Sequence, residues 1–327
     1  MDFKLLKKPQ LFCEQYKNNY LTVINLTKRY KRNMLPAISD LNFTVGPGEF
    51  HAFIGGNGAG KTTTIKSIVG AYARYSGSIY FSGYLNTTLQ AKRTMGYIPE
   101  IARFPENVST YRYLLNMAIL SELKKSEAKK VVEQILVDIN MQKLAKKSPN
   151  TFSSGQKKKI LLAQALIHDP KILIMDEPAA NLDPRARIDF FDTLKKLQQQ
   201  GKSIFISSHI LNEVDKYATH ATILDGGKIV FTGDLKKYRQ RHQEQIMLKV
   251  DNIQKCTKIL EKNNISFTFN RNNDSFVIAN TKKLDTNKLL LQLIAVKVKI
   301  IAFKYGATSL EEIYYKYVIK GSVHTSE

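Results

Sequence analysis

The stretch GGNGAGKT, from Gly55 to Thr62, constrains the fold of this chain more than any other. It matches G-x-x-x-x-G-K-T without a mismatch; the apolar run EFHAFIG leads into it, and KTTTIKSIVG follows with helical spacing. Glycines let backbone N–H groups turn inward around a phosphate, and a helix that starts near Lys61 adds its partial positive end. The sequence therefore predicts a strand, a phosphate-binding loop and a helix in that order.

The polar side chains of this loop have distinct expected roles. Lys61 is expected to reach the β- and γ-phosphates, the Thr62 hydroxyl suits Mg²⁺, and Thr63 is expected to add a phosphate hydrogen bond. The predicted nucleotide-binding residues of the loop are Gly55, Gly56, Asn57, Gly58, Ala59, Gly60, Lys61, Thr62 and Thr63.

A second motif, KILIMDEP, supplies acidic groups for the same chemistry. Its apolar residues predict a buried strand that delivers Asp176 and Glu177 at its carboxyl end, where ligands bind in open α/β sheets. Asp176 is expected to hold Mg²⁺ through water, because Mg²⁺ keeps several waters and few carboxylates. Glu177 is placed to polarise an attacking water. An acidic pair at a strand end is often only solvated, but a complete phosphate loop upstream favours the site.

The pattern between these motifs predicts an α/β fold. Strands and helices alternate, which is typical of a parallel sheet covered on both faces. Ser126 is a candidate cap of one helix and Gly201 a candidate stop of another. The predicted helices are 112–125, 126–141, 158–167 and 191–200; the predicted strands are 20–30, 41–45 and 203–208, with a hairpin turning at 225–227.

The C-terminal part follows another order. From IMLKV at 246–250 to KVKIIAF at 297–303 the pattern reads β-α-β-β-α-β, the split ferredoxin-like arrangement, and a closing helix follows at 309–320. The basic stretch KKYRQRHQ at 236–243 is the expected domain boundary.

Composition narrows the class of protein but not its partner. The chain carries 50 Lys and Arg against 28 Asp and Glu, a net charge of +22, which suits nucleic acid, anionic lipid or nucleotide phosphates. The basic residues are spread along the chain, so solvated faces are the simpler explanation. No apolar stretch is long enough for a membrane span or a signal peptide, and Cys13 and Cys256 form no zinc pair.

Further motifs, taken in order, resemble the nucleotide-binding subunit of an ABC transporter over residues 20–235. Tyr30 lies where that family has an aromatic that stacks on adenine, and Glu100 lies at the Q-loop position. Phe152-Ser153-Ser154-Gly155-Gln156 is similar to the signature Leu-Ser-Gly-Gly-Gln. Ala180-Asn181-Leu182-Asp183 resembles the D-loop, and His209 resembles the switch histidine.

The resemblance implies a fold and a mechanism. The fold is an ABC-type P-loop NTPase with a mixed β core and a helical subdomain at about 101–160. Two subunits would sandwich two ATP molecules head to tail, with Ser153, Gly155 and Gln156 of one facing the nucleotide of the other. Glu177 would orient water, His209 would hold Glu177 and the γ-phosphate in register, and Asp183 would join the nucleotide-binding set. Hydrolysis would then move the helical subdomain against a membrane partner.

Three positions depart from the family pattern. Gly56 replaces a proline or serine, and Glu100 replaces glutamine while keeping an oxygen able to ligate Mg²⁺, a change that resembles exporters more than importers. Ser154 replaces the first signature glycine at a place where a small side chain should fit. Lys157, Lys158 and Lys159 behind it are expected to attract phosphates or to be solvated.

The resulting prediction is an ATP-hydrolysing motor subunit of an ABC exporter, peripheral on the cytoplasmic face of the membrane. It would act with a separate permease and a second ATP-binding subunit, with ATP and Mg²⁺ as cofactors and without nucleic acid.

SLEEIYYKYV resembles the tail of bacitracin-resistance ATPases, and the C-terminal module resembles the regulatory extension of lipid exporters, although a dimerising or stabilising role is equally open. The expected domains are an extension at 1–19, the ATP-binding domain at 20–238 and an accessory α+β domain at 239–327. A soluble ABC ATPase acting on nucleic acid or the ribosome remains the alternative.

Overall fold

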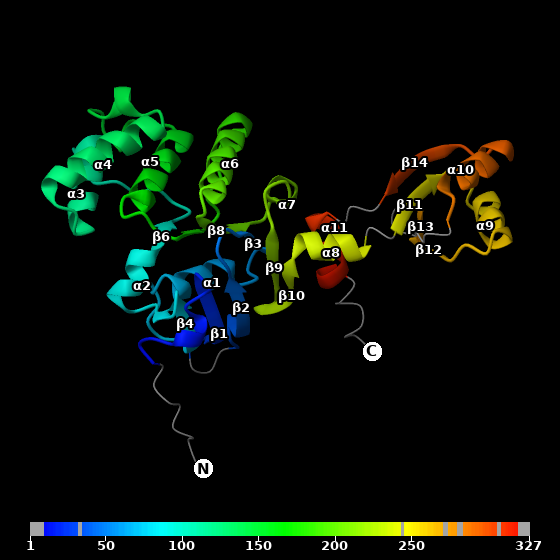
Figure 1. Ribbon diagram of the computed structural model, residues 1–327, viewed down its shortest axis with the longest axis horizontal. Helices are drawn as coiled ribbons and strands as arrows, with labels where there is room; N and C mark the ends of the chain where they lie inside the picture. Colours follow the sequence, from blue (N-terminus) through cyan, green and yellow to red (C-terminus); the bar gives the residue numbers. More distant parts are fainter. Residues whose placement is uncertain are drawn as a thin grey trace, which may run out of the picture. The chain divides into compact units, whose positions relative to one another are not determined.

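The strand and helix on either side of the phosphate loop form as predicted. A computed structural model describes residues 10–31, 35–242, 245–270, 274–279, 284–305 and 309–319 (Figure 1). Strand β3 (Phe50–Gly55) is fully buried along its length and leads into the loop, and helix α1 (Lys61–Ile68) starts at the end of the loop.

The chain divides into two units. One contains the residues up to Gly233 together with those from Tyr317 on, and the other is Asp234–Lys316. Residues 1–9 of the expected N-terminal extension and 320–327 of the C-terminus lie outside the described residues.

The first unit is built around a six-stranded sheet in the order β10-β9-β3-β8-β7-β6. The five strands from β9 to β6 pair in parallel, as the alternation of strands and helices predicts. The strands besides β3 are β6 (Met95–Ile98), β7 (Ile172–Met175), β8 (Ser203–Ser208), β9 (His220–Asp225) and β10 (Lys228–Asp234).

A smaller antiparallel sheet packs on the first. Its order is β2-β1-β4-β5, and Phe43 of β2 stacks on Phe53 of β3 and Phe205 of β8 with ring centroids 5.7 and 5.6 Å apart. Apolar residues of both sheets and of α1 share one core, which fixes the phosphate loop to a rigid base. The strands are β1 (Leu21–Lys28), β2 (Ile38–Val45), β4 (Ser76–Phe81) and β5 (Tyr84–Leu85).

Three helices pack on one another and form a helical group, labelled in Figure 1: α3 (Thr110–Leu120), α4 (Lys125–Asp138) and α5 (Ser154–Leu166). The predicted cap of α4 is wrong: the helix begins before Ser126, and its N-cap Lys124 gives no side-chain hydrogen bond. Ser109, by contrast, caps α3 by accepting from the backbone N–H of Arg112. The remaining helices of this unit are α2 (Leu89–Thr94), α6 (Pro184–Gln199) and α7 (Leu211–Val214), with short 3-10 turns at Glu14–Tyr16, Gln142–Leu144 and Pro149–Thr151.

The second unit contains a four-stranded antiparallel sheet in the order β12-β13-β11-β14. Its strands and helices appear in the predicted β-α-β-β-α-β order and share a core that includes Leu248 and Phe276. The stretch that contains the expected boundary lies mostly in a helix, α8 (Leu235–His242), which starts just after the border between the two units at Gly233 and Asp234. The other elements are β11 (Gln245–Val250), α9 (Ile253–Lys262), β12 (Phe267–Asn270), β13 (Ser275–Ala279), α10 (Thr286–Ala295), β14 (Ile300–Tyr305), α11 (Leu310–Tyr314) and a π-helical turn (Tyr315–Ile319).

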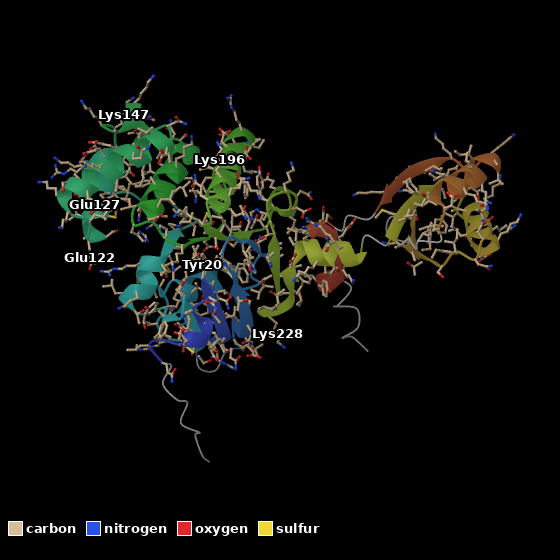
Figure 2. The ribbon with its side chains drawn as sticks, in the orientation of Figure 1. Tyr20, Glu122, Glu127, Lys147, Lys196 and Lys228 are labelled. Atoms are coloured by element: carbon tan, nitrogen blue, oxygen red, sulfur yellow. The ribbon has the colours of Figure 1, made fainter. Side chains whose placement is uncertain are left out.

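Surface lysines account for much of the positive charge. Lys147, Lys196 and Lys228 are all exposed, and the first two point away from the ribbon in Figure 2. Among the described residues, no helix has the length and apolarity needed to cross a bilayer.

His51 in β3 makes the stability of the first unit depend on pH. The ring is buried, its Nδ1 lies 3.2 Å from Glu49 Oε2, and its Nε2 lies 2.8 Å from Thr222 Oγ1. Burial lowers the pKa of His51 below 6.5, and the nearby His220 adds to this, while Glu49 opposes it. The unfolded chain therefore binds this proton first as the pH falls.

We expect the free energy of unfolding to fall by about 1.4 kcal/mol per pH unit once the pH drops below about 6.5, until it passes the lower folded pKa. Urea denaturation at pH 7.5 and 5.5 measures this slope. His51→Phe, which keeps a ring beside Phe43 and Phe205, is the control and should flatten it. Equal slopes in the two proteins would contradict the assignment.

Candidate functional site

Four neighbouring parallel strands end at one edge of the six-stranded sheet, each with a polar segment. The strand order β3-β8-β7-β6 sets side by side the phosphate loop after β3, His209 after β8, Asp176 and Glu177 after β7, and Glu100 after β6. Ligands of open α/β sheets bind at the carboxyl ends of such strands. The fold thus gathers groups that lie far apart in the sequence.

These segments surround a cavity of about 400 Å³. Its lining consists of predicted residues and of Ala37, which the sequence did not indicate: Tyr30, Ala37, Gly56, Asn57, Gly58, Gly60, Lys61, Thr62, Thr63, Glu100, Glu177, Ala180 and His209. Gly55, Ala59 and Asp176, which belong to the same segments, do not line it, and neither do Ser153, Gly155, Gln156 and Asp183. The predicted residues therefore form one cavity and a separate set outside it.

Two glycines of the loop are required by close packing. Gly60 has a φ of +107°, and a Cβ there would lie 2.5 Å from Ile38 Cγ2 and 3.0 Å from the Ala37 carbonyl oxygen. A Cβ on Gly55 would lie 2.6 Å from the Leu224 carbonyl oxygen. Any side chain at either position would push the loop off its base, so the loop shape depends on these residues.

Lys61 is buried at the centre of the loop. Its Nζ donates to the carbonyl oxygens of Gly55 (2.8 Å) and Gly56 (3.2 Å) and lies 3.4 Å from Glu177 Oε1. A cation held on the loop backbone beside a carboxylate is suited to meet an incoming phosphate. The ammonium therefore links the phosphate loop to the acidic pair.

Asp176 is 1% exposed and is held by two hydroxyls. Thr62 Oγ1 donates to its Oδ1 (3.2 Å), and Ser207 Oγ donates to the same oxygen (2.9 Å). Burial raises the pKa of Asp176, and the charges of Glu100 and Glu177 raise it further, while the two hydroxyls lower it. Ser207 was not predicted, since a serine inside SIFISS reads as an ordinary strand residue.

Glu177 and His209 form a contact pair at the cavity. Glu177 Oε2 lies 2.6 Å from His209 Nδ1, and Ser207 Oγ accepts from the Glu177 backbone N–H (2.8 Å). The backbone of Glu177 has a φ of +44°, which is uncommon for a residue with a Cβ and typical of functional sites. This turn lets the carboxylate reach Lys61 and His209 together.

Tyr30 lies at the cavity, as predicted, but it is engaged with the protein. Its hydroxyl lies 2.8 Å from Thr63 Oγ1, and its ring packs edge-on against Tyr72 with centroids 5.9 Å apart. The side chain remains 56% exposed, and Lys28 Nζ lies 5.7 Å from the ring centroid.

The signature segment starts helix α5. Ser153 is its N-cap: Ser153 Oγ accepts from the Gln156 N–H, and Gln156 Oε1 accepts from the Ser153 N–H, a capping box. Ser154 is exposed as the first helical residue, so its side chain is tolerated there. A Cβ on Gly155 would lie 3.1 Å from Ala186 Cβ, so the glycine permits α5 to approach α6.

An unpredicted arginine ties the D-loop to the histidine segment. Arg187 of α6 donates to the Leu182 carbonyl oxygen (3.0 Å) and to Glu213 Oε1 (2.5 Å), and Glu213 lies in α7 just after His209. Asp183 caps α6 by accepting from the Ala186 N–H (2.9 Å). No local pattern indicates the pair, because its partners are brought together only by packing.

The three lysines after the signature do not behave alike. Lys157 and Lys159 are partly exposed, but Lys158 is buried, so the expectation that all three are solvated or attract phosphates is wrong for Lys158. Helical spacing turns this position inward, toward the strand that precedes Glu100.

Comparisons with known proteins identify one family of relatives. A family model described as ABC transporter matches residues 38–180. A Mycoplasma pneumoniae protein described as an ABC transporter ATP-binding protein is 40% identical over 279 residues, 85% of each chain. The linearmycin resistance ATP-binding protein LnrL of Bacillus subtilis is 30% identical (85% of this chain, 84% of that one), and the bacitracin transport ATP-binding protein BcrA of Bacillus licheniformis is 27% identical (91% and 97%).

Solved structures are similar as well. An ATP-binding subunit of an ABC transporter has a TM-score of 0.61 and 30% identity, covering 68% of this chain and 92% of its own. CbiO1 of Clostridium perfringens, part of the transporter complex cbiONQ, has a TM-score of 0.59 and 26% identity, covering 68% and 96%. The chain therefore belongs to the ABC transporter family and is an ATP-binding subunit with ATPase chemistry.

Proposed function

We propose that this protein is the ATP-hydrolysing motor of an exporter and works as a head-to-tail pair of ATP-binding subunits. The observation that carries the proposal is the split between the two sets of residues. Tyr30, the phosphate loop, Glu177 and His209 surround one cavity, whereas Ser153 and Gly155 lie outside it. A second subunit supplying those signature residues would close the cavity over the nucleotide.

Each group of the cavity has a role in hydrolysis. Lys61 binds the β- and γ-phosphates, and the exposed ring of Tyr30 receives the adenine. Glu177 orients the attacking water and accepts its proton at a carboxylate oxygen, while His209 holds that carboxylate in place. Phosphoryl transfer depends mostly on positioning and charge stabilisation, which this arrangement provides.

The residues present fit Mg²⁺. Thr62, Asp176 and Glu100 offer a hydroxyl and carboxylate oxygens, the ligands that Mg²⁺ prefers, and the Thr62 hydroxyl already lies against Asp176. Among the described residues there is no cluster of three or more His, Cys, Asp or Glu side chains of the kind that holds a metal by protein ligands alone. Mg²⁺ would be held by few carboxylates together with water and the phosphates, whose charge it would offset.

The membrane partner is proposed from the relatives. The bacitracin and linearmycin proteins are named for transport of, or resistance to, antibiotics, and CbiO1 is named as part of a transporter complex. We infer that this chain binds a separate permease at the cytoplasmic face of the membrane.

Purification of the tagged, full-length chain from its own cells, with and without detergent, tests this proposal. Co-purification of a protein with several membrane spans in detergent supports it. Recovery solely in the soluble fraction, bound to RNA, would overturn it in favour of a nucleic-acid ATPase.

Ser154 is expected to be neutral for ATP hydrolysis. Because its side chain is exposed and Ser153 and Gly155 keep the groups that face the phosphate, Ser154→Gly should change kcat by less than about threefold, within the range of ordinary surface substitutions. Gly155→Ala is the matched comparison, since its Cβ would crowd Ala186, and it should lower kcat more. Steady-state ATPase assays of the two variants measure kcat. A larger loss of kcat in Ser154→Gly than in Gly155→Ala would contradict the prediction.

The second unit is proposed to be a ferredoxin-like accessory domain. The element order from β11 to β14, the sheet order β12-β13-β11-β14 and the antiparallel pairing of all neighbours support this class. Both helices contribute to one core with the sheet. We propose that the ATP-binding role belongs to the first unit and a regulatory role to the second.

A further inference from the structure

Lys158 is a buried cation that the mechanism above does not use. It lies on α5, one and a half turns after the signature residue Ser153, and only 4% of it is exposed. Its Nζ donates to the backbone carbonyl oxygens of Pro99 (2.9 Å) and Glu100 (2.5 Å). One side chain thus connects the signature helix to the segment that ends β6.

The Lys158 ammonium is held in its buried position by backbone groups. A buried charge is costly unless polar groups compensate it, and backbone carbonyl oxygens accept hydrogen bonds from Lys158 Nζ. Burial lowers the pKa of Lys158 to about 8, and the more distant charges of Glu100 and Asp176 act in the opposite direction. Two carbonyl oxygens are therefore its direct partners, and they hold it by charge-assisted hydrogen bonds.

The two segments that Lys158 connects would face different nucleotides in the proposed dimer. Glu100 lines the cavity of its own subunit. Ser153 and Gly155, at the start of α5, would face the nucleotide bound by the partner. The stretch of α5 between Ser153 and Lys158 is short enough to move as a rigid unit. A displacement of the Pro99–Glu100 backbone would therefore shift the signature residues through Lys158, and a displacement of the signature residues would shift the Pro99–Glu100 backbone.

We propose that Lys158 is a positioning residue that couples the Glu100 segment of one ATP site to the signature residues of the other. This inference rests on the proposed head-to-tail dimer. Its role is mechanical: the ammonium fixes the distance between two backbone segments and touches neither nucleotide.

The test compares full-length Lys158→Met, Lys158→Arg and Lys157→Met with the unchanged protein. Methionine fills the same space without a donor, arginine restores the donors, and Lys157 is a partly exposed neighbour with no role in the link. ATPase rates over a range of ATP concentrations give kcat, KM and the Hill coefficient, and a fluorescent ATP analogue gives the affinity of single subunits.

For Lys158→Met we expect kcat to fall about tenfold and the Hill coefficient to approach about 1, while the affinity of the analogue changes by less than about threefold. Lys158→Arg should recover most of the loss, and Lys157→Met should behave as the unchanged protein. Lys158→Gln, which keeps a shorter donor, takes the place of the methionine variant if that one does not fold.

Unchanged kcat and cooperativity in Lys158→Met would overturn the role of Lys158, as would a loss confined to nucleotide affinity. The absence of ATP cooperativity in the unchanged protein would instead contradict the head-to-tail dimer. The two failures are therefore distinguishable.

Discussion

Glu177→Gln is expected to lower kcat for ATP hydrolysis by about 10²–10⁴, the usual contribution of a positioned base. The amide keeps the size of the side chain and a contact with His209 Nδ1, but it cannot accept the proton of the attacking water. The phosphate loop is untouched, so ATP binding should remain and ATP should persist in a trapped dimer. Single-turnover hydrolysis and size-exclusion chromatography with ATP measure the two effects.

Glu127→Gln is the matched control for this variant. Glu127, labelled in Figure 2, is exposed in the helical group and does not line the cavity. It should hydrolyse ATP as the unchanged protein does. Near-normal turnover by Glu177→Gln would show that another group accepts the proton.

Lys61→Met is expected to remove most of the affinity for ATP. A hydrogen bond to a charged group contributes about 1.5–3 kcal/mol, so losing one such contact raises Kd by roughly 10–150-fold. The substitution also removes the two bonds that Nζ donates to the carbonyl oxygens of Gly55 and Gly56. Titration with a fluorescent ATP analogue measures the change.

Lys129→Met on α4 is the comparison, because it removes the same charge from an exposed position. Its Kd should match that of the unchanged protein. If Lys61→Met bound ATP with unchanged affinity, the cavity around this lysine would not be the phosphate site.

Much of the site was predictable because each of its motifs is a short continuous stretch of sequence. The phosphate loop, the acidic pair after β7 and the histidine after β8 each follow a buried strand, and such strands are recognisable by their apolar runs. The helix α5 was predicted from the apolar run at 158–167, and the capping box of Ser153 and Gln156 at its start was not recognised.

The site residues that the sequence did not predict were missed for one common reason. Ser207, Lys158 and Arg187 gain their roles from partners 31, 58 and 26 residues away in the sequence. A serine in a strand or a lysine in a basic run carries no local sign of such a partner. The helix α8 was missed for a different reason: charged residues also favour solvated linkers, and its apolar positions are few.

The sequence by itself determined the nucleotide chemistry and the strand–loop–helix unit that carries it, because glycine geometry and short-range periodicity are local properties. Only the tertiary structure decided which groups meet. The sheet order β3-β8-β7-β6 places segments from Gly55 to His209 at one edge, and the signature residues lie outside the cavity that these segments surround. Strand order depends on the packing of the whole core, which no single stretch of sequence specifies.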